Sequence, residues 1–400
     1  MPDEHHVRMN DYPLAPEKMM INQKMISPYS RRLFKNLFLK SSKVEKLVPT
    51  LLPKKKYVVH YRNLQFYLEQ GMVLEKIHRI LAFKQSRWLA QYIQYNTDMR
   101  MKAKNSFEKD YYKLLNNAYF GKTMENVRKR INVILVTEAK RLKKLASKPN
   151  YEDFIVFHEH LLGVRLKQET LKLNKPIYIG FSVLELSKLA MFEFHYRHMK
   201  PKYGDNLKLC FTDTDSLLYE ITTDDVYKDM QEDSHLYDTS DYPTTHSLHS
   251  NKNKKIPGLM KDEMNGAIIE EFVGLRAKMY SVKLFGGKEL KKAKGVPKMV
   301  VDKEIQHDNY KRSLLQQWQT NARFNTIQSK RHQLRLLEMK KKSLCPGDDK
   351  RWVCEDGFTT LAHGHYQTIG EPEDEDDEMD IDEIEIEDID DIEIDDNIFL

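Results

Sequence analysis

The spacing of hydrophobic and polar positions predicts helices and strands in the first half of the chain. Partial alternation with β-branched and aromatic residues favours strands at 57–67 and 76–83. Long runs of helix formers with few breakers predict helices at 86–103 and 106–128. The same criteria then predict a buried strand, a basic amphipathic helix and a strand pair, at 131–137, 138–147 and 153–167.

The second half mixes the two classes again. Residues 181–199 are apolar nearly all round, and the polar Glu185, Lys188 and Arg197 fall near one narrow stripe, so we expect a mostly buried helix. Residues 206–222 alternate around a central Asp-Thr-Asp-Ser, which predicts a hairpin. We expect an irregular surface segment, returning strands and a long basic helical region to follow, at 223–257, 258–271 and 305–342.

Charge divides the chain into a basic body and an acidic end. Of the 60 acidic residues, 18 fall between Glu371 and Leu400, a stretch without Lys or Arg. The rest of the chain carries 65 basic against 42 acidic residues, a formal charge of +23. Such an excess favours a polyanionic partner, most often nucleic acid, although ribosomal and membrane-surface proteins share it. The end alternates Ile with acid without turn residues, and we expect a disordered tail.

Cysteine usage and hydropathy favour an intracellular protein, with the nucleus as one option. No run approaches the roughly 20 apolar residues that cross a bilayer, so no membrane partner is expected, and the polar first ten residues do not resemble a signal peptide. The three cysteines form no disulfide framework. A zinc site is the alternative for four of the side chains, but their spacing matches no common finger: Cys345, Cys354, His363 and His365.

The hairpin turn carries two carboxylates that can share a divalent cation. Asp213 and Asp215 stand two apart in FTDTDSLLYEI. Mg²⁺ is usually held by one or two carboxylates together with substrate phosphates. A solvated turn explains the same residues equally well, because Asp and Ser hydrogen-bond their own backbone there. A metal nuclease and a sugar-nucleotide transferase that uses Asp-x-Asp on manganese also fit.

The helix predicted at 106–128 presents an unusual face in its KLLNNAYFG segment. Lys113, Asn117, Phe120 and Gly121 stand at i, i+4, i+7 and i+8, and Lys109 lies one turn earlier. This face offers ammonium groups for a triphosphate, an amide, an aromatic ring for a base pair, and a glycine that permits close approach. An ordinary amphipathic helix is the alternative, but Phe120 and Gly121 are odd choices for a polar face.

Together these motifs resemble the protein-primed family B DNA polymerases, as carried by Maverick/polinton-type mobile elements. KLLNNAYFG is similar to motif B (K-x-x-x-N-S-x-Y-G), and FTDTDS to motif C (Y-x-D-T-D-S). Further on, Lys278 and Tyr280 match the K-x-Y motif that contacts the primer terminus, and Lys294-Gly295 follows as expected. NDYPLAPE, KKKYVVHYRNL, GKTMENVRKR and EFVGLRAKMYS extend the resemblance to about residues 10–366.

The resemblance implies a DNA-directed DNA polymerase, a nucleotidyltransferase of DNA replication. Asp215 would be the firm metal ligand and Asp213 a weaker one, for Mg²⁺ or Mn²⁺. Lys113 would bind the triphosphate of an incoming dNTP, Asn117 would position the nucleotide, and Phe120 would pack the new base pair. Lys109 and Gly121 would complete this nucleotide-binding face. Expected partners are template and primer DNA, dNTPs and a terminal protein that supplies the priming hydroxyl.

The resemblance implies an α+β fold with a polymerase palm, in which helices pack on an antiparallel sheet, helical fingers, a small thumb and a disordered acidic tail. The expected domains are a partial palm with the protein-primed-specific region, fingers, palm, a basic thumb-like region and the tail, at 1–83, 84–128, 129–285, 286–366 and 367–400.

One catalytic carboxylate of the family has no counterpart here. Motif A lies upstream of the segment that resembles NDYPLAPE, and Asp3, Glu4 and Asp11 lack its context. The exonuclease expected further upstream is missing too. The two-metal site is therefore incomplete, and the sequence predicts a polymerase fragment whose activity on its own is in doubt. The alternative is a catalytically inactive, nucleic-acid-binding remnant of a mobile-element polymerase.

Overall fold

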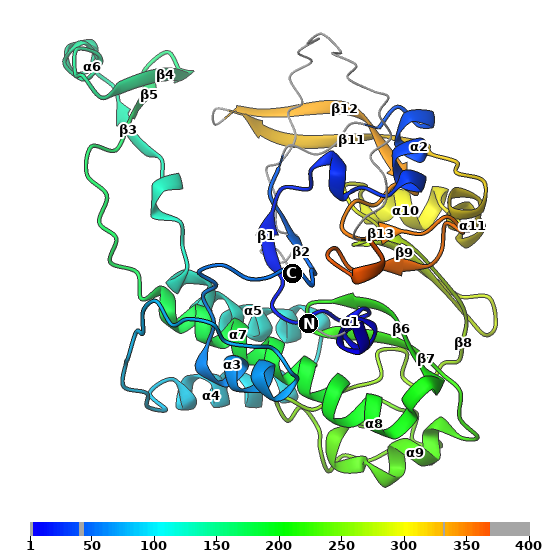
Figure 1. The fold of residues 1–400 in the computed structure, drawn as a ribbon. Helices are drawn as coiled ribbons and strands as arrows, with labels where there is room; N and C mark the ends of the chain where they lie inside the picture. The colour runs from blue at the N-terminus through cyan, green and yellow to red at the C-terminus, as the bar shows by residue number, and fades with distance from the viewer. Residues whose placement is uncertain (1–2, 40–43, 331–332, 369–400) are drawn as a thin grey trace. The chain divides into compact units, whose positions relative to one another are not determined.

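A computed structural model describes residues 3–39, 44–330 and 333–368 of the 400-residue chain (Figure 1). The fold is mixed α+β with several small antiparallel sheets, which confirms the predicted class at this level. The tail predicted at 367–400 lies outside the described residues, apart from 367 and 368, which end a short 3₁₀ turn.

The chain forms two compact units, and two helices cross from one to the other. The large unit comprises Met1–Leu114, Leu184–Asn321 and Lys342–Leu400, and the small unit comprises Leu115–Val183 and Ala322–Lys341. Helix α5 (Ser106–Thr123) changes unit after Leu114, and helix α7 (Ile177–Glu193) after Val183.

Helices of the large unit alternate with short sheets along the sequence. The other helices are α1 (Asp3–Met9), α2 (Pro28–Asn36), α3 (Tyr61–Glu69), α4 (Ala90–Lys102), α8 (Lys200–Tyr203), α9 (Val226–Glu232), α10 (Lys298–Glu304) and α11 (His307–Leu315). The antiparallel sheets are β1 (Glu17–Met19) with β2 (Lys46–Val48), β6 (Leu207–Asp213) with β7 (Ser216–Ile221), β8 (Ile269–Arg276) with β9 (Met279–Leu284) and β10 (Glu289–Ala293), and β13 (Trp352–Val353) with β14 (Thr360–Leu361).

The core of the large unit is aromatic. The second half of α7 runs directly into a π-helical turn (Phe194–Met199) and buries its side chains against α3 and the chain that follows α1. Burial of large aromatic side chains contributes most to such a core. Its buried members are Met9, Leu14, Ala15, Phe66, Tyr67, Leu189, Phe192 and Tyr196. The helix predicted at 181–199 is thus confirmed.

Glu185 differs from the prediction that it would share a polar stripe, because only 2% of it is exposed. Its carboxylate accepts a hydrogen bond from Lys188 Nζ at 2.9 Å and lies 3.4 Å from the His60 backbone nitrogen. A buried carboxylate needs such partners, because an unpaired buried charge is costly. Glu185 therefore joins α7 to the start of α3.

The strand predicted at 57–67 was wrong, because its second half begins α3. His60 caps this helix, its Nδ1 accepting a hydrogen bond from the Arg62 backbone nitrogen at 3.3 Å. The buried positions Asn63, Phe66, Tyr67 and Gln70 recur with helical spacing. Aromatic content favoured a strand, but burial against α7 decided the structure. The strand predicted at 76–83 is also absent, since these residues have no regular structure.

The long helix predicted at 305–342 was wrong beyond α11. The chain continues as strands β11 (Thr320–Lys330) and β12 (Gln333–Leu344), which form a two-stranded sheet. In β11 the more buried Ala322, Phe324 and Thr326 alternate with exposed neighbours. Alternation with period two fits a strand, and it prevails over the helix propensity of single residues.

The strands predicted at 258–271 were mostly wrong. A 3₁₀ turn follows α9, turns continue to residue 268, and β8 begins only at Ile269. Asp238 and Asp262 fix this irregular segment, because their carboxylates accept backbone N–H groups from residues 240, 255, 264 and 266. The irregular surface segment predicted at 223–257 therefore extends further than expected, and it also contains α9.

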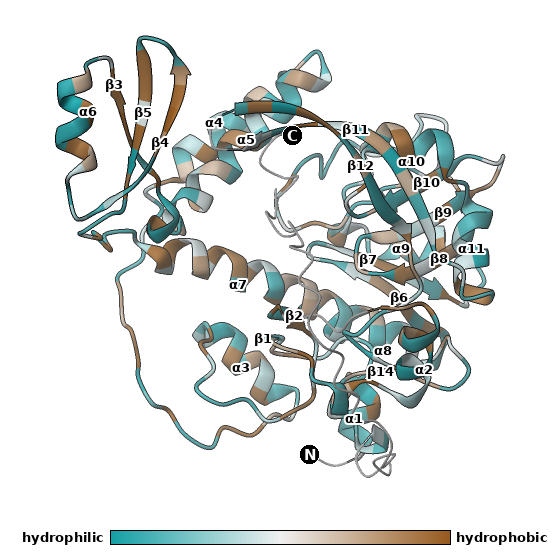
Figure 2. Cartoon of the chain, turned by 90° about the horizontal axis from the view of Figure 1, so that it is seen from above, coloured by the Kyte–Doolittle hydropathy of each residue, from teal (hydrophilic) through white to brown (hydrophobic). Residues whose placement is uncertain are grey.

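Besides most of the β11–β12 sheet, the small unit contains a three-stranded sheet with one covering helix. Strands β3 (Asn132–Val136), β4 (Tyr151–His158) and β5 (Leu161–Leu166) have the order β3-β5-β4, and α6 (Ala139–Ala146) packs on one face. Figure 2 shows the apolar strands beside this amphipathic helix. All four elements lie where the sequence predicts them, but the strand predicted to be buried is not, since only Val136 of β3 is buried and Leu135 is 58% exposed. The buried contacts are made by Val136, Leu145, Val164 and Leu166.

Residues 345–368 fold back onto the N-terminal segment of the large unit. The Asn10 side chain accepts a hydrogen bond from the Ala362 backbone nitrogen at 2.8 Å and donates one to Thr360 O at 3.1 Å. Arg351 donates to Thr360 Oγ1 at 2.7 Å and to Asn10 O at 3.1 Å. Leu51 adds a backbone hydrogen bond to His363 O at 2.8 Å. We call this set of contacts the terminal clasp.

Candidate functional site

The motif-C-like residues form a tight hairpin, as predicted. Asp213 pairs with Ser216 at the last position of the β6–β7 ladder, and Thr214 and Asp215 make the turn. Thr214 has φ of +54°, which is unusual for a β-branched residue. The Asp215 backbone nitrogen donates to Asp213 O at 2.6 Å, and Ser216 Oγ donates to the same oxygen at 3.2 Å. The turn therefore holds the two acidic residues in a fixed, strained backbone.

Both carboxylates of this turn are available to a ligand. Asp213 is half-buried and Asp215 is exposed. Among the residues that the structure describes, neither carboxylate takes part in a hydrogen bond or an ion pair, and no group of three His, Cys, Asp or Glu side chains is placed to hold a metal ion. Two free carboxylates suit a hard cation that also takes phosphate and water oxygens. They supply only part of a two-metal site.

Aromatic rings join this hairpin to the β8–β9–β10 sheet. The Phe211 ring lies 4.6 Å from Tyr280 and 6.0 Å from Phe272, measured between centroids. Burial, followed by the nearby carboxylates of Asp213 and Glu263, raises the pKa of Tyr280. The tyrosine predicted to contact a primer therefore lies beside the predicted metal-binding turn, although the two are separated by more than 60 residues in sequence.

The same sheet gathers the other residues predicted to bind DNA. Lys278 forms the β8–β9 turn with φ of +58°, and the Lys294 backbone nitrogen donates to Lys278 O at 3.0 Å. Gly295 has φ of +84°, a conformation that favours glycine. Lys278, Lys294 and Gly295 are exposed. The structure thus brings Asp213, Lys278, Tyr280 and Lys294 onto adjoining elements.

Lys350, for which the sequence alone indicates no role, lies near both Lys46 and Lys294. Burial, and then repulsion from Lys46 and Lys294, lowers the pKa of Lys350, while Asp348 and Asp349 oppose this effect. Lys46 also pairs with Asp349 at 2.6 Å. No local signal identifies these lysines, because Lys46, Lys294 and Lys350 come from distant parts of the chain. Asp348 and Asp349 lie beside Lys46 and Lys350. These two lysines therefore add no excess positive charge to the exposed Lys278 and Lys294.

The predicted nucleotide-binding face follows one side of helix α5. Lys109, Lys113, Asn117 and Gly121 are all exposed, and Phe120 beside them is half-buried. The helix is continuous from Ser106 to Thr123, so these side chains follow one another turn by turn. The helix confirms the sequence prediction; the ligand and the roles of these residues remain predictions.

Gly121 has no evident structural reason to be glycine. A Cβ atom built on it would meet no other atom within 4 Å, and its φ lies outside the left-handed region. Glycine inside a helix costs roughly 0.5–1 kcal/mol relative to alanine. Packing within the fold therefore does not explain a glycine at this position.

A fully buried histidine, His195, contacts strand β7 of the acidic hairpin. His195 Nδ1 lies 3.0 Å from the Tyr219 hydroxyl of β7, and the two rings stack at an interplanar angle of 3°. Burial, and then repulsion from Lys200, lowers the pKa of His195 to about 4. The imidazole is therefore neutral at pH 7 in the folded protein.

Acidification is expected to destabilise the large unit through His195. The histidine pKa is about 6.5 when unfolded and about 4 when folded, so the unfolded chain binds more protons between these values. The contribution of the neutral His195 imidazole to the free energy of unfolding is fully present above pH 6.5. It is lost as the pH falls to 4, a loss of up to roughly 3 kcal/mol. Urea unfolding at several pH values measures it. His195→Gln should flatten the curve, and exposed His160→Gln should not; equal curves for His195→Gln and the unmodified chain would contradict the assignment.

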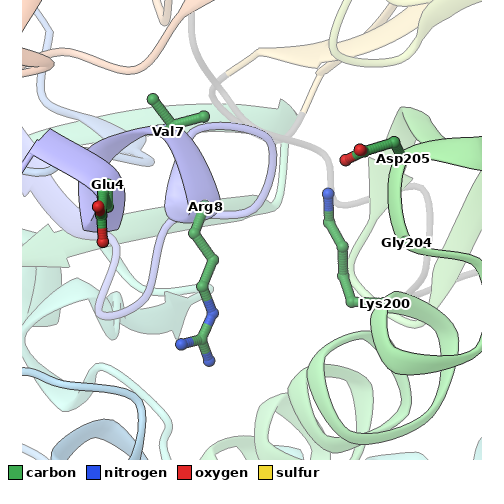
Figure 3. A pocket seen from close by; sticks show the side chains of 6 residues that line it. All are labelled: Glu4, Val7, Arg8, Lys200, Gly204 and Asp205. Atoms are coloured by element: carbon green, nitrogen blue, oxygen red, sulfur yellow. The ribbon is translucent and has the colours of Figure 1, made fainter.

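A cavity of about 430 Å³ opens elsewhere in the large unit (Figure 3). None of the predicted site residues lines it. Its cations and carboxylates are balanced in number, so it offers no excess charge to a polyanion. The lining residues are Glu4, Val7, Arg8, Lys200, Gly204 and Asp205.

The alternative zinc site is not supported. Cys345 is buried and Cys354 half-buried, His363 Nε2 bonds to Asp349 O at 2.9 Å, and in the described part of the chain no three His, Cys, Asp or Glu side chains are grouped to hold a metal ion. Within the described ranges, no helix has the length and apolarity to span a membrane. Comparison of the chain with protein-family models, curated proteins and solved structures finds no match.

Proposed function

We propose that the chain is the palm, fingers and thumb portion of a protein-primed family B DNA polymerase of a mobile element. The observation that carries the proposal is the exposed face of α5. It presents Lys109, Lys113 and Asn117 in line with a glycine that packing does not require. A nucleotide whose triphosphate contacts the lysines and whose base pair lies over Gly121 would explain why these residue types occur on this face.

The β6–β7 hairpin and its neighbouring sheet support the same function. Asp215, with Asp213, would hold Mg²⁺ or Mn²⁺, which stabilises charge on the reacting phosphate oxygens. Tyr280 and Lys278 would hold the primer end beside the hairpin, and Lys294 would bind its backbone. Contacts of this kind bind phosphate by charge rather than by sequence. A terminal protein would supply the first hydroxyl.

The inactive remnant is a second candidate, and one observation favours it. In the described parts of the chain, no third His, Cys, Asp or Glu joins Asp213 and Asp215 in a metal-binding group. The remnant would retain the basic surface and bind DNA without extending it.

Primer extension by the purified chain separates these functions. A labelled primer is annealed to four templates that differ in the next base, and each dNTP is added separately with Mg²⁺ or Mn²⁺. The polymerase predicts addition of the complementary nucleotide only, and a chelator should stop it. Salt-sensitive DNA binding without addition would contradict an active polymerase and support the remnant. Shortening of the primer would indicate a nuclease.

A further inference from the structure

The irregular segment 223–268 places one lysine at the end of helix α4. Lys255 Nζ donates to Arg100 O, in the last turn of α4, at 3.2 Å. The Lys255 backbone nitrogen donates to Asp238 Oδ2 at 2.8 Å, and Asp238 is only 5% exposed. Lys255 has φ of +56° and is half-buried. Contacts at both ends of the residue therefore fix its ammonium group.

This position gathers cations from three elements of the large unit. Burial, and then repulsion from Arg100, Lys109 and Lys254, lowers the pKa of Lys255. Asp241 is the acid that acts on Lys255 in the opposite direction, but its carboxylate already pairs with Lys261. Three cations therefore act on Lys255 against one acid whose carboxylate is already paired. A bound polyanion would relieve the repulsion.

Lys255 retains the donors that such a ligand needs. An ammonium group has three donors, and the bond to Arg100 O uses one of them. Lys254 is exposed beside it. Lys109, which repels Lys255, is the first position of the nucleotide-binding face of α5, and Lys113 follows it on the same face one turn later.

We propose that Lys254 and Lys255 bind phosphate groups of the same ligand as Lys109 and Lys113, and so extend this face to the 223–268 segment. The identity of the ligand as a nucleoside triphosphate rests on the proposed function. The sequence alone indicates no role for this segment. In this arrangement it contributes to triphosphate binding and does not merely cover the surface.

Binding of inorganic tripolyphosphate to the full chain tests the proposal by calorimetry. The double variant Lys254→Gln/Lys255→Gln should weaken binding about tenfold, since each charge-assisted contact to phosphate is strong. Lys254→Gln alone should weaken it about threefold, and it leaves the Lys255 contact with α4 intact. Lys252→Gln, on an exposed lysine of the same segment, is the matched control and should have no effect.

The outcomes separate this inference from the proposed function. Unchanged tripolyphosphate binding in the double variant and in Lys254→Gln would overturn the inference, as would a wild-type chain that does not bind tripolyphosphate. A loss confined to single-stranded DNA, titrated in parallel, would overturn the assignment to a triphosphate. Primer extension is scored independently, so the polymerase proposal can fail while the phosphate site stands, and the reverse.

Discussion

Replacing Asp215 by alanine is expected to reduce metal-dependent nucleotide addition at least about a hundredfold. Loss of the exposed carboxylate removes one of the two charges that would hold the cation, and the charge of the ion is what stabilises the reacting phosphate. DNA binding should persist, because the basic surface around Lys278 and Lys294 is untouched. Primer extension and fluorescence anisotropy on the same preparation measure the two properties.

Substitutions of two other acidic residues provide a comparison and a control for this experiment. Asp213→Ala should have a smaller effect, about tenfold, because the resemblance implies a weaker ligand there. Asp224→Ala removes an exposed acid just after β7 and should leave extension unchanged. Equal activity of Asp215→Ala and the unmodified chain would show that the hairpin does not bind the catalytic metal.

Replacing Arg351 by methionine is expected to lower the free energy of unfolding of the large unit by about 2–4 kcal/mol. The guanidinium makes hydrogen bonds to both the backbone and the side chain of Asn10 and Thr360. Methionine removes the donor to Asn10 O and Thr360 Oγ1, whereas Asn10 Oδ1 and Thr360 O keep their hydrogen bonds from Ala362 and Asn10. An unsatisfied buried acceptor costs about 1–3 kcal/mol. Solvent reaches part of Arg351, which limits the loss. Urea unfolding followed by tryptophan fluorescence measures it.

Arg32→Met is the matched control for this prediction. Arg32 pairs with Glu355, but both side chains are about 60% exposed, and exposed ion pairs contribute roughly 0–1 kcal/mol. Arg351→Lys should remain well below the unmodified chain, because an ammonium group does not reproduce the planar donor pattern of arginine. If Arg351→Met and Arg32→Met have the same effect, the terminal clasp does not stabilise the fold.

Local sequence patterns predicted the correct secondary structure where the periodicity of the side chains alone determines it. Alternation on both sides of Asp213 and Asp215 predicted the β6–β7 hairpin, and the amphipathic pattern at 138–147 predicted α6. The exposed face of α5 also followed from spacing alone. In each case the period of the side chains matches the period of the backbone, so no distant contact is needed to decide the structure.

Tertiary contacts decided the elements that were predicted wrongly. Tyr61, Phe66 and Tyr67 favour strands by composition, but α3 buries Phe66 and Tyr67 against Phe192. In β12, helix formers such as Leu336 and Glu338 lie in a strand because β11 pairs with it. Residue propensity is a weak prior when such pairing is available.

The candidate site depended on contacts that no local pattern contains. The positions of Lys350 near Lys46 and Lys294, and of Lys255 beside Arg100, follow from the fold alone. Lysine is common on any basic surface, so its presence in the sequence does not identify a neighbour more than 150 residues away. The ring contact between Phe211 and Tyr280 could not be predicted from a local sequence pattern either.

The terminal clasp can form only late in synthesis on the ribosome. Tyr12 can pack on Phe192 and Tyr196 once residues up to about 200 have emerged. Asn10 can contact Thr360 only after the 350 residues from Asn10 to Thr360 have been synthesised. At about 5–20 residues per second this takes roughly 20–70 s. During that interval the polar groups of the Asn10 segment have no clasp partner in the nascent chain. A chaperone or a wrong partner thus has its opportunity before translation ends, not after.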